Sequence, residues 1–534
     1  MGSPAFDHAV NTSRARHEAR ERVRQTQQGR GRPIISEKVN EHQLIAVANR
    51  LHSSNTWKTF IDFLTYYIKA KLTAEWGNAE LAKPLADRHP ILQWYDAVCQ
   101  AQARSIETPG VPASMEVTGA LACYYGLAYA LYLIEHNVEL QSRMIARLKD
   151  RSNFQGAYYE LIIARAMIAA GFELILEDEV DRGSQHCEFA AVSPDTGEKF
   201  WIEAKMRSVA GLLGKNETDG VDSEKAKNPI SHLATHLHAA LRKPAADQRM
   251  IFIDLNAEMG PEASDDRPPE FVEAVNRRLL KYERETLEPG KTAYVFVTNM
   301  TFHRDLLMPA QMLSIPSGMG IPDFNRSGQM RLSEIYRRDR KHSDALRVAE
   351  SMAGLLKFPT TFDGSMSASA LFGERSPIQI DEKYVFEGAD PDGRDLVGTV
   401  TDAIVDESRK EVIVAVHTEG DKAYLLREKM SDLQFADYKA HPDAYFGKVK
   451  YVPKGIKTPY DLFVFFVEGQ RGMERTKLLE HLRLNEEEAA GVPDEELLFD
   501  YCERLVSGSG MFEIVDGVIT GNPNPAKRKI PASG

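Results

Sequence analysis

The residues best suited to chemistry lie between positions 153 and 208. This stretch contains three glutamates, Glu160, Glu188 and Glu203. Lys205 follows two residues after Glu203. Carboxylate oxygens are the ligands that hard divalent cations such as Mg²⁺ prefer, and a nearby lysine can balance charge or act on a water molecule. These residues therefore predict a divalent-metal site suited to phosphodiester hydrolysis.

The spacing of these residues predicts a β-hairpin. The segments HCEFAAV and EKFWIEAK are joined by the turn-rich SPDTG. With the turn centred between residues 195 and 196, facing residues have positions that sum to 391, so Glu188 lies opposite Glu203. Side chains alternate along a strand, which puts Glu203 and Lys205 on one face. Because two facing carboxylates repel each other, we expect a cation between them.

This register is the prediction on which the metal site depends. A bulge at Gly197 would shift the pairing by one residue and turn Glu188 away. Asp178 and Asp181 lie nearby and are then the alternative acidic ligands. A second alternative is that the acidic and basic residues of the last strand form only a surface ion pair, which would contribute little to stability.

Glu160 lies on a predicted helix that precedes the strands. Gly156, Ala157 and Ala164 lie three or four residues away from it and Met167 seven residues away, so all four share its helix face, and they are small or apolar. Such a stripe indicates a helix face that packs on a sheet, so we expect Glu160 to be largely shielded from solvent and to reach the same metal region.

The order of these residues resembles the PD-(D/E)xK, or restriction-endonuclease-like, nuclease superfamily. That superfamily has a core of helix, three strands, helix and strand. Its acidic residues lie on the first helix and at the start of the second strand, and (D/E)xK lies on the third. Glu203-Ala204-Lys205 matches the third strand, Glu188 the second and Glu160 the helix. The likeness covers residues 153–256, and Glu188 departs from the aspartate usual at its position.

The resemblance implies roles for these residues. Glu188 and Glu203 would bind Mg²⁺ or Mn²⁺, with the Ala204 carbonyl as a further ligand and Glu160 completing or supporting the shell. Lys205 would orient the attacking water. The implied activity is that of a hydrolase, a metal-dependent endonuclease acting on DNA, and family members that pair their sites suggest a homodimer. A role in antiviral defence or in a mobile element is analogy. The alternative is a non-catalytic nucleic-acid-binding or assembly protein that keeps the fold.

Further candidates surround this motif. Arg207, Lys215, Lys225 and Lys227 could contact phosphates, although interleaved acidic residues make a solvated mixed-charge loop the alternative. Arg242 and Lys243 could do the same, or could be charges favoured at a helix C-terminus. His232 and His236 have the i, i+4 spacing seen in zinc sites, but no third ligand is evident, so a solvated or substrate-facing helix face is the better interpretation.

Bulk properties limit the class of protein. The net charge of −12 means that any binding of a polyanion is local. Four cysteines without a CxxC pair fit a reducing cytoplasm, and we expect a cytoplasmic protein. Residues 117–134 form an uncharged stretch of 18 residues, in which tyrosines and glycines are spread along the length. This pattern favours a buried helix over a membrane span.

The chain of 534 residues is long enough for several domains, and we expect a multidomain α+β protein. Its parts are an N-terminal helical domain, a central restriction-endonuclease-like α/β sandwich with a mixed sheet, and a small C-terminal β-rich domain with terminal helices. Continuous apolar runs at 249–256 and 292–300 predict buried strands, and DLFVFFVEG predicts another strand. The expected boundaries are a disordered basic arm at 1–36, the helical domain at 37–150, the nuclease-like domain at 151–300, a connecting region with a helix at 301–376, the β-rich domain at 377–470, and helices with a tail at 471–534.

Overall fold

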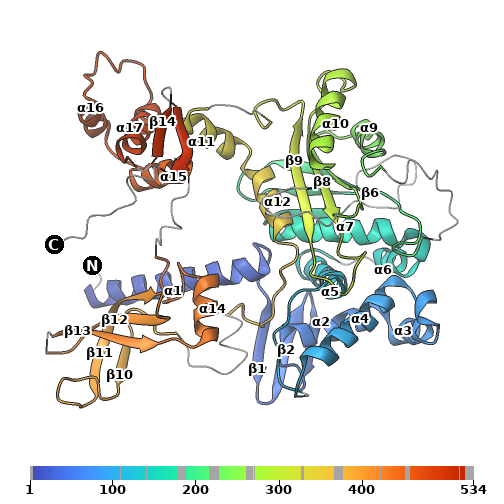
Figure 1. Ribbon diagram of the computed structural model, residues 1–534, viewed down its shortest axis with the longest axis horizontal. Helices are drawn as coiled ribbons and strands as arrows, with labels where there is room; N and C mark the ends of the chain where they lie inside the picture. Colours follow the sequence, from blue (N-terminus) through green and yellow to red (C-terminus); the bar gives the residue numbers. More distant parts are fainter. Residues whose placement is uncertain are drawn as a thin grey trace. The chain divides into compact units, whose positions relative to one another are not determined.

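A computed structural model describes most of the chain (Figure 1). It covers residues 4–108, 110–139, 142–176, 188–215, 228–259, 269, 271–325, 330–365, 377–420, 422–450, 458–510, 512–515 and 518–523. The chain forms two compact units, one of Met1–Ile321 with Arg347–Lys450 and the other of Pro322–Leu346 with Tyr451–Gly534. Helices and sheets are mixed throughout, and the largest sheet contains both parallel and antiparallel pairs. The expectation of an α+β chain with a mixed sheet is therefore confirmed.

The N-terminal region is more ordered than we expected. The basic arm is a helix, α1 (Pro4–Gln28), and not a disordered segment. It buries Ala19 and Val23 and forms ion pairs to distant residues, Arg16 to Glu382 at 2.7 Å among them. Three short antiparallel strands follow in the region that we predicted to be wholly helical: β1 (Ile35–Val39), β2 (His42–Val47) and β3 (Arg50–Ser54).

A set of helices precedes the central sheet. The uncharged stretch forms α5, which is buried along almost its whole length, so the prediction of a buried helix is confirmed. No helix in the described part of the chain is long and apolar enough to cross a bilayer. The helices of this region are α2 (Phe60–Leu72), α3 (Ala74–Leu81), the 3₁₀ turn η1 (Leu85–Asp87), α4 (Pro90–Ser105), α5 (Gly119–Asn137) and α6 (Ser142–Lys149).

The central sheet has six strands in the order β4-β5-β6-β7-β8-β9. The pairs β6–β7 and β7–β8 are parallel, whereas β4–β5, β5–β6 and β8–β9 are antiparallel. The strands are β4 (Glu173–Leu176), β5 (Phe189–Val192), β6 (Lys199–Met206), β7 (Gln248–Asp254), β8 (Ala293–Met300) and β9 (Met312–Met319). Both strands predicted from continuous apolar runs, at 249–256 and 292–300, are confirmed as β7 and β8.

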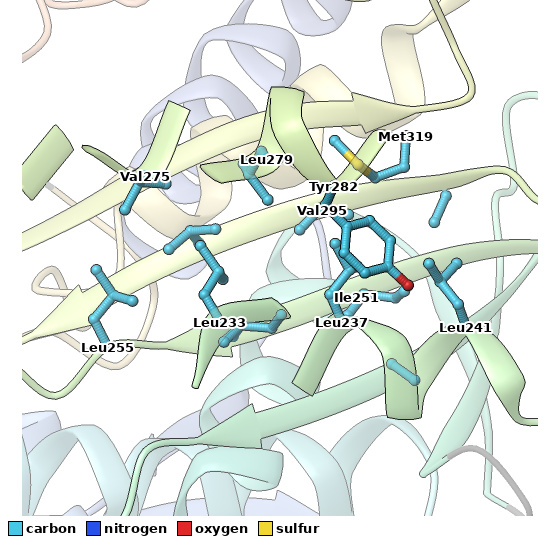
Figure 2. Close-up of a cluster of buried hydrophobic side chains, with 14 of the residues drawn as sticks. Leu233, Leu237, Leu241, Ile251, Leu255, Val275, Leu279, Tyr282, Val295 and Met319 are labelled. Carbon is cyan, nitrogen blue, oxygen red and sulfur yellow. The ribbon is translucent and has the colours of Figure 1, made fainter. Parts of the chain in front are cut away.

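Helices cover both faces of this sheet. The helix α7 (Arg151–Ala169) packs on β4 and β6. On the opposite face, α9 (Leu233–Arg242) and α10 (Phe271–Glu285) bury leucines against alternate residues of β7 and β8, such as Ile251 and Val295 (Figure 2). Successive residues of a strand point to opposite faces, which is why Phe252 and Phe296 stack on each other away from this core.

The first unit also contains a four-stranded antiparallel sheet with one helix. Its strands are β10 (Lys383–Phe386), β11 (Leu396–Asp406), β12 (Glu411–His417) and β13 (Ala423–Lys429), and its helix is α14 (Asp432–Ala440). Residues 407–410 form the turn that joins β11 to β12.

The second unit is mainly helical. It contains α11 (Leu332–Lys341), α15 (Pro459–Gly469), α16 (Arg475–Leu482), α17 (Asp494–Gly508), β14 (Phe512–Val515) and β15 (Val518–Pro523), and α12 (Ser343–Ala353) begins in this unit. The prediction of a strand at DLFVFFVEG was wrong, because these residues form α15. The helix begins with a capping box between Thr458 and Asp461 and buries Leu462, Phe463 and Val467 at helical spacing.

Candidate metal and nucleic-acid site

The predicted hairpin register is confirmed. Phe189 pairs with Ile202 and Val192 with Lys199, so the positions of facing residues sum to 391. Glu188, directly before β5, donates its backbone N–H to the Ile202 carbonyl at 3.0 Å. Gly197 adopts a positive φ of 73° in the connection, and the pairing beyond it continues without a shift. The recorded pairing ends at Phe189 and Ile202, and the Glu188 N–H bonds to Ile202 instead of Glu203, so Glu188 lies at the end of the ladder beside Glu203 without forming a facing pair with it.

Glu188 and Glu203 share the same two cations. The Lys205 Nζ atom lies 3.0 Å from Glu188 Oε1 and 2.6 Å from Glu203 Oε1. The Lys243 Nζ atom lies 2.7 Å from Glu203 Oε2 and 3.8 Å from Glu188 Oε1. Since each ammonium lies within 4 Å of both carboxylates, these carboxylates are close enough to hold one cation between them.

The participation of Lys243 was not predicted. Its sequence position, directly after α9, suggested a phosphate contact or a charge favoured by the helix dipole. Its contact with Glu203 depends on the path of α9 over the sheet, which brings residue 243 beside β6. The sequence feature that could have indicated this role is that the segment 228–246 contains no aspartate or glutamate.

Burial controls the electrostatics of the site. The Glu203 side chain is only 2% exposed, and burial raises its pKa despite Lys205 and Lys243. Burial acts to lower the pKa of Lys205, but Glu203 and Glu188 outweigh it and hold this pKa above its ordinary value. Lys205 is therefore an ammonium at neutral pH, which suits it to donate hydrogen bonds and excludes it as a proton acceptor in this state.

Glu160 lies beside this pair and is held by a different residue. Arg147 of α6 donates two hydrogen bonds to its carboxylate, each 2.6 Å long. Glu160 is 8% exposed, which agrees with the expectation that it is shielded from solvent. Burial raises its pKa against the effect of Arg147, and the charge of Glu188 raises it further, which indicates that the two carboxylates are near each other. We refer to Glu160, Glu188 and Glu203, with Arg147, Lys205 and Lys243, as the carboxylate cluster.

The oxygen atoms of this cluster suit a hard divalent cation. Glu203 Oε1 is buried, and the Lys205 ammonium lies 2.6 Å from it. Carbonyls two residues apart in a strand point to the same side, so Ala204 directs its carbonyl toward the side from which Glu188 approaches Ile202. Two carboxylates and this carbonyl are the ligands that Mg²⁺ and Mn²⁺ take. No group of three or more His, Cys, Asp or Glu side chains among the described residues is arranged to hold a metal ion, so water molecules would have to complete the shell.

The predicted phosphate-binding residues have different positions. Arg207 is buried, and its guanidinium donates to the carbonyls of Leu255 and Asn256 at 2.6 Å and 2.9 Å. Its role in the structure is therefore to join the ends of β6 and β7. Lys215 is partly exposed and donates to the Ser152 carbonyl at 3.3 Å. The other two predicted contacts and the two alternative acidic ligands lie outside the described residues: Lys225, Lys227, Asp178 and Asp181.

A second polar cluster lies at the ends of β7 and β8. Asp254 accepts hydrogen bonds from Thr298 Oγ1 at 2.8 Å and from the backbone N–H groups of Asn256 and Met300 at 2.8 Å and 2.9 Å. Burial raises the pKa of Asp254 to about 7. We refer to these four residues as the Asp254 cluster. The sequence signal that marks it is an aspartate at the end of the buried apolar run of β7.

No family model, curated protein or solved structure matches this chain. Inferences about its function therefore depend on the geometry described above.

Proposed function

We propose that the chain is a divalent-metal-dependent nuclease of the restriction-endonuclease-like type that hydrolyses phosphodiester bonds in DNA. The observation that carries the proposal is that Glu188 and Glu203, at one end of the hairpin, share the same cations. The order α7, β4, β5, β6, α9, β7, with β6 parallel to β7 and helices on both faces, supports it, because this is the core expected of that superfamily.

The roles of the residues follow from their contacts. Glu188, Glu203 and the Ala204 carbonyl would hold the cation, and Glu160 would add negative charge beside it. Mg²⁺ bound there would lower the pKa of a water molecule and offset charge on the phosphate. Lys205, as an ammonium, would donate hydrogen bonds that orient the attacking water against the phosphate. Lys243 would exchange its contact with Glu203 for one with substrate when the cation binds.

One observation favours a second function. Each described carboxylate of the cluster already has a cationic partner: Arg147 for Glu160, and lysines for Glu188 and Glu203. Such a balanced network can also stabilise a fold without catalysis. The second candidate is therefore a non-catalytic nucleic-acid-binding or assembly protein that keeps the nuclease fold.

Cleavage assays distinguish the two. The full chain would be incubated with single- and double-stranded DNA and RNA in Mg²⁺, Mn²⁺ or EDTA, beside Glu203→Ala and Lys205→Ala. We expect cleavage of DNA in Mg²⁺ or Mn²⁺, none in EDTA, and none by either variant. The matched control is Glu173→Ala, which removes an exposed glutamate of β4. Cleavage that persists in both variants would contradict the site, and binding without cleavage would favour the second candidate.

The proposal also includes an oligomeric state and a biological setting. A homodimer would bring two sites to the two strands of a duplex, and light scattering on the purified chain would measure it. A setting in antiviral defence remains an analogy with other nucleases that carry additional domains. A monomer that cuts only single strands would remove the argument for pairing without affecting the assignment of the site.

A further inference from the structure

One flank of α9 faces the carboxylate cluster and carries two histidines that the proposed mechanism does not use. Residues 232, 236, 239 and 243 are spaced by four, three and four positions, so they lie within about 60° of one another around the helix axis. The contact of Lys243 with Glu203 fixes the direction of this flank. The adjacent flank, with Leu233, Leu237 and Leu241, packs into the core of the sheet (Figure 2).

The direction of α9 places His236 on the side of Glu203 where Lys205 lies. The strands β6 and β7 are parallel, so the helix that connects them runs antiparallel to both. Residues 243 and 236 are about 10 Å apart along the helix axis. The step from 243 to 236 runs in the same direction as β6 from Glu203 to Lys205, which are about 7 Å apart along the strand. Lys205 contributes to the electrostatic environment of His236, which agrees with this placement.

The charge of this segment favours an anionic ligand. Residues 228–246 contain two cations and three histidines but no aspartate or glutamate, in a chain whose net charge is −12. Burial lowers the pKa of His236, and the neighbouring His232 and Lys205 act in the same direction. A neutral imidazole keeps one N–H donor, which is what a phosphate oxygen accepts.

We propose that His236 is a substrate-binding residue that donates a hydrogen bond to the nucleic-acid backbone, to the phosphate adjacent to the one held at Lys205. His232, one turn earlier and exposed, extends the same track. The three side chains His232, His236 and Lys243 then form a phosphate-contacting stripe along α9. This inference rests on the proposed function, since it assumes that the ligand of the carboxylate cluster is a nucleic acid.

Binding in EDTA tests the stripe without cleavage. Affinities of labelled single-stranded and duplex DNA would be measured for the wild type, His236→Ala, His236→Gln and His238→Ala, with circular dichroism and melting temperature as checks of folding. We expect H236A to bind about tenfold more weakly, at the lower end for a hydrogen bond to a charged group. H236Q keeps an N–H donor and should stay within about threefold of the wild type.

His238→Ala is the matched control, because it removes the same side chain from the same helix on a different face. His238 contacts the Tyr282 hydroxyl at 3.2 Å. Its substitution should leave DNA affinity within about twofold. Equal affinities for H236A and H238A, or an H236Q variant as weak as H236A, would overturn the inference, as would a wild type that binds no nucleic acid.

The inference and the proposed function fail separately. If the wild type cleaves DNA in Mg²⁺ while all variants bind alike, the function stands and the histidine stripe does not. If the wild type binds DNA through His236 but cuts nothing in any metal, the stripe stands and the nuclease assignment fails. In active enzyme, H236A should raise KM more than it lowers kcat, because the contact is made before and during the reaction.

Discussion

The carboxylate cluster and the Asp254 cluster lie in the same sheet but differ in the groups that satisfy their charges. Asp254 is held by two backbone N–H groups and the Thr298 hydroxyl. Glu203 is held by the ends of two lysines, which are long and flexible side chains. Backbone donors cannot move without disturbing the strands, whereas lysine side chains can.

This difference determines which cluster can exchange its partners for a ligand. The Asp254 cluster is suited to fix where β7 and β8 end, and therefore to support the sheet. The carboxylate cluster keeps three carboxylates together with long cationic side chains, and Lys205, Glu188 and Lys243 are 28%, 21% and 17% exposed. We therefore expect substitutions in the first cluster to change stability and substitutions in the second to change activity.

The largest expected effect separates the two clusters by activity. Glu203→Gln should slow DNA cleavage by roughly 10²- to 10⁴-fold, because a neutral amide holds a divalent cation poorly and several kcal/mol of charge stabilisation are lost. Asp254→Asn should leave the rate per folded molecule within about twofold. Initial rates in Mg²⁺, corrected for the folded fraction, would measure both. Equal losses in the two variants would show that the clusters do not have separate roles.

The next effect is on stability. Asp254→Asn should lower the free energy of unfolding by about 1–3 kcal/mol, because the amide would direct N–H groups at backbone N–H donors. Urea titration followed by circular dichroism would measure it. Asp87→Asn, which changes an exposed aspartate of η1, serves as the control and should be nearly neutral. An Asp254→Asn variant as stable as the control would mean that the hydrogen bonds of Asp254 do not hold the strands.

The loss of stability in Asp254→Asn should depend on pH. The pKa of Asp254 is about 7 in the folded chain, above the ordinary value of 3.8. A carboxyl group whose pKa is raised in the folded chain contributes to stability at low pH. The contribution is complete at pH values below the pKa of the unfolded chain, and it disappears as pH rises through about 7. The deficit of Asp254→Asn should therefore be about 3 kcal/mol larger at pH 5 than at pH 8. A deficit that grows with pH would show that the ionised form is the one that the fold stabilises.

A smaller effect tests the lysines of the carboxylate cluster. Lys243 acts to lower the pKa of Glu203, so Lys243→Met should raise that pKa. Because Glu203 must be ionised to hold a cation, the acidic limb of the pH–rate profile should move upward by about one pH unit. Arg242→Met removes an exposed charge from a different face of α9 and should leave the limb in place. An unchanged limb in Lys243→Met would indicate that Lys243 does not influence the ionisation of Glu203.

The local part of the site was predictable from the sequence. A short turn and strict alternation fix which residues face each other in a hairpin, so the register that brings Glu188 close to Glu203 required no knowledge of the rest of the chain. The buried strands β7 and β8 were equally clear, because their apolar runs are continuous. Glu160 was identified from the small residues around it on α7.

Features that depend on distant contacts were missed. The roles of Lys243 and Arg147 follow from how α9 and α6 lie against the sheet and α7, which the local pattern does not contain. Short strands with exposed residues, such as β1, carry little hydrophobic signal. In α15 the apolar run suggested a strand, and the capping box that begins the helix was overlooked. The polar composition of α1 did not indicate an ordered helix. In the structure, α1 forms ion pairs to residues more than 300 positions away in the sequence.

The hairpin between β5 and β6 has a consequence for how such a gene can change. The number of residues in its connection, from Ser193 to Glu198, determines the register between β5 and β6. Replacing side chains in the turn leaves that count unchanged, whereas inserting or deleting a single codon would shift the register of the hairpin by one residue and turn the side chains of β5, and Glu188 with them, to the other face of the sheet. We therefore expect functional variants of this connection to differ freely in composition. Its length should stay the same, or change only by numbers of residues that preserve the register between β5 and β6.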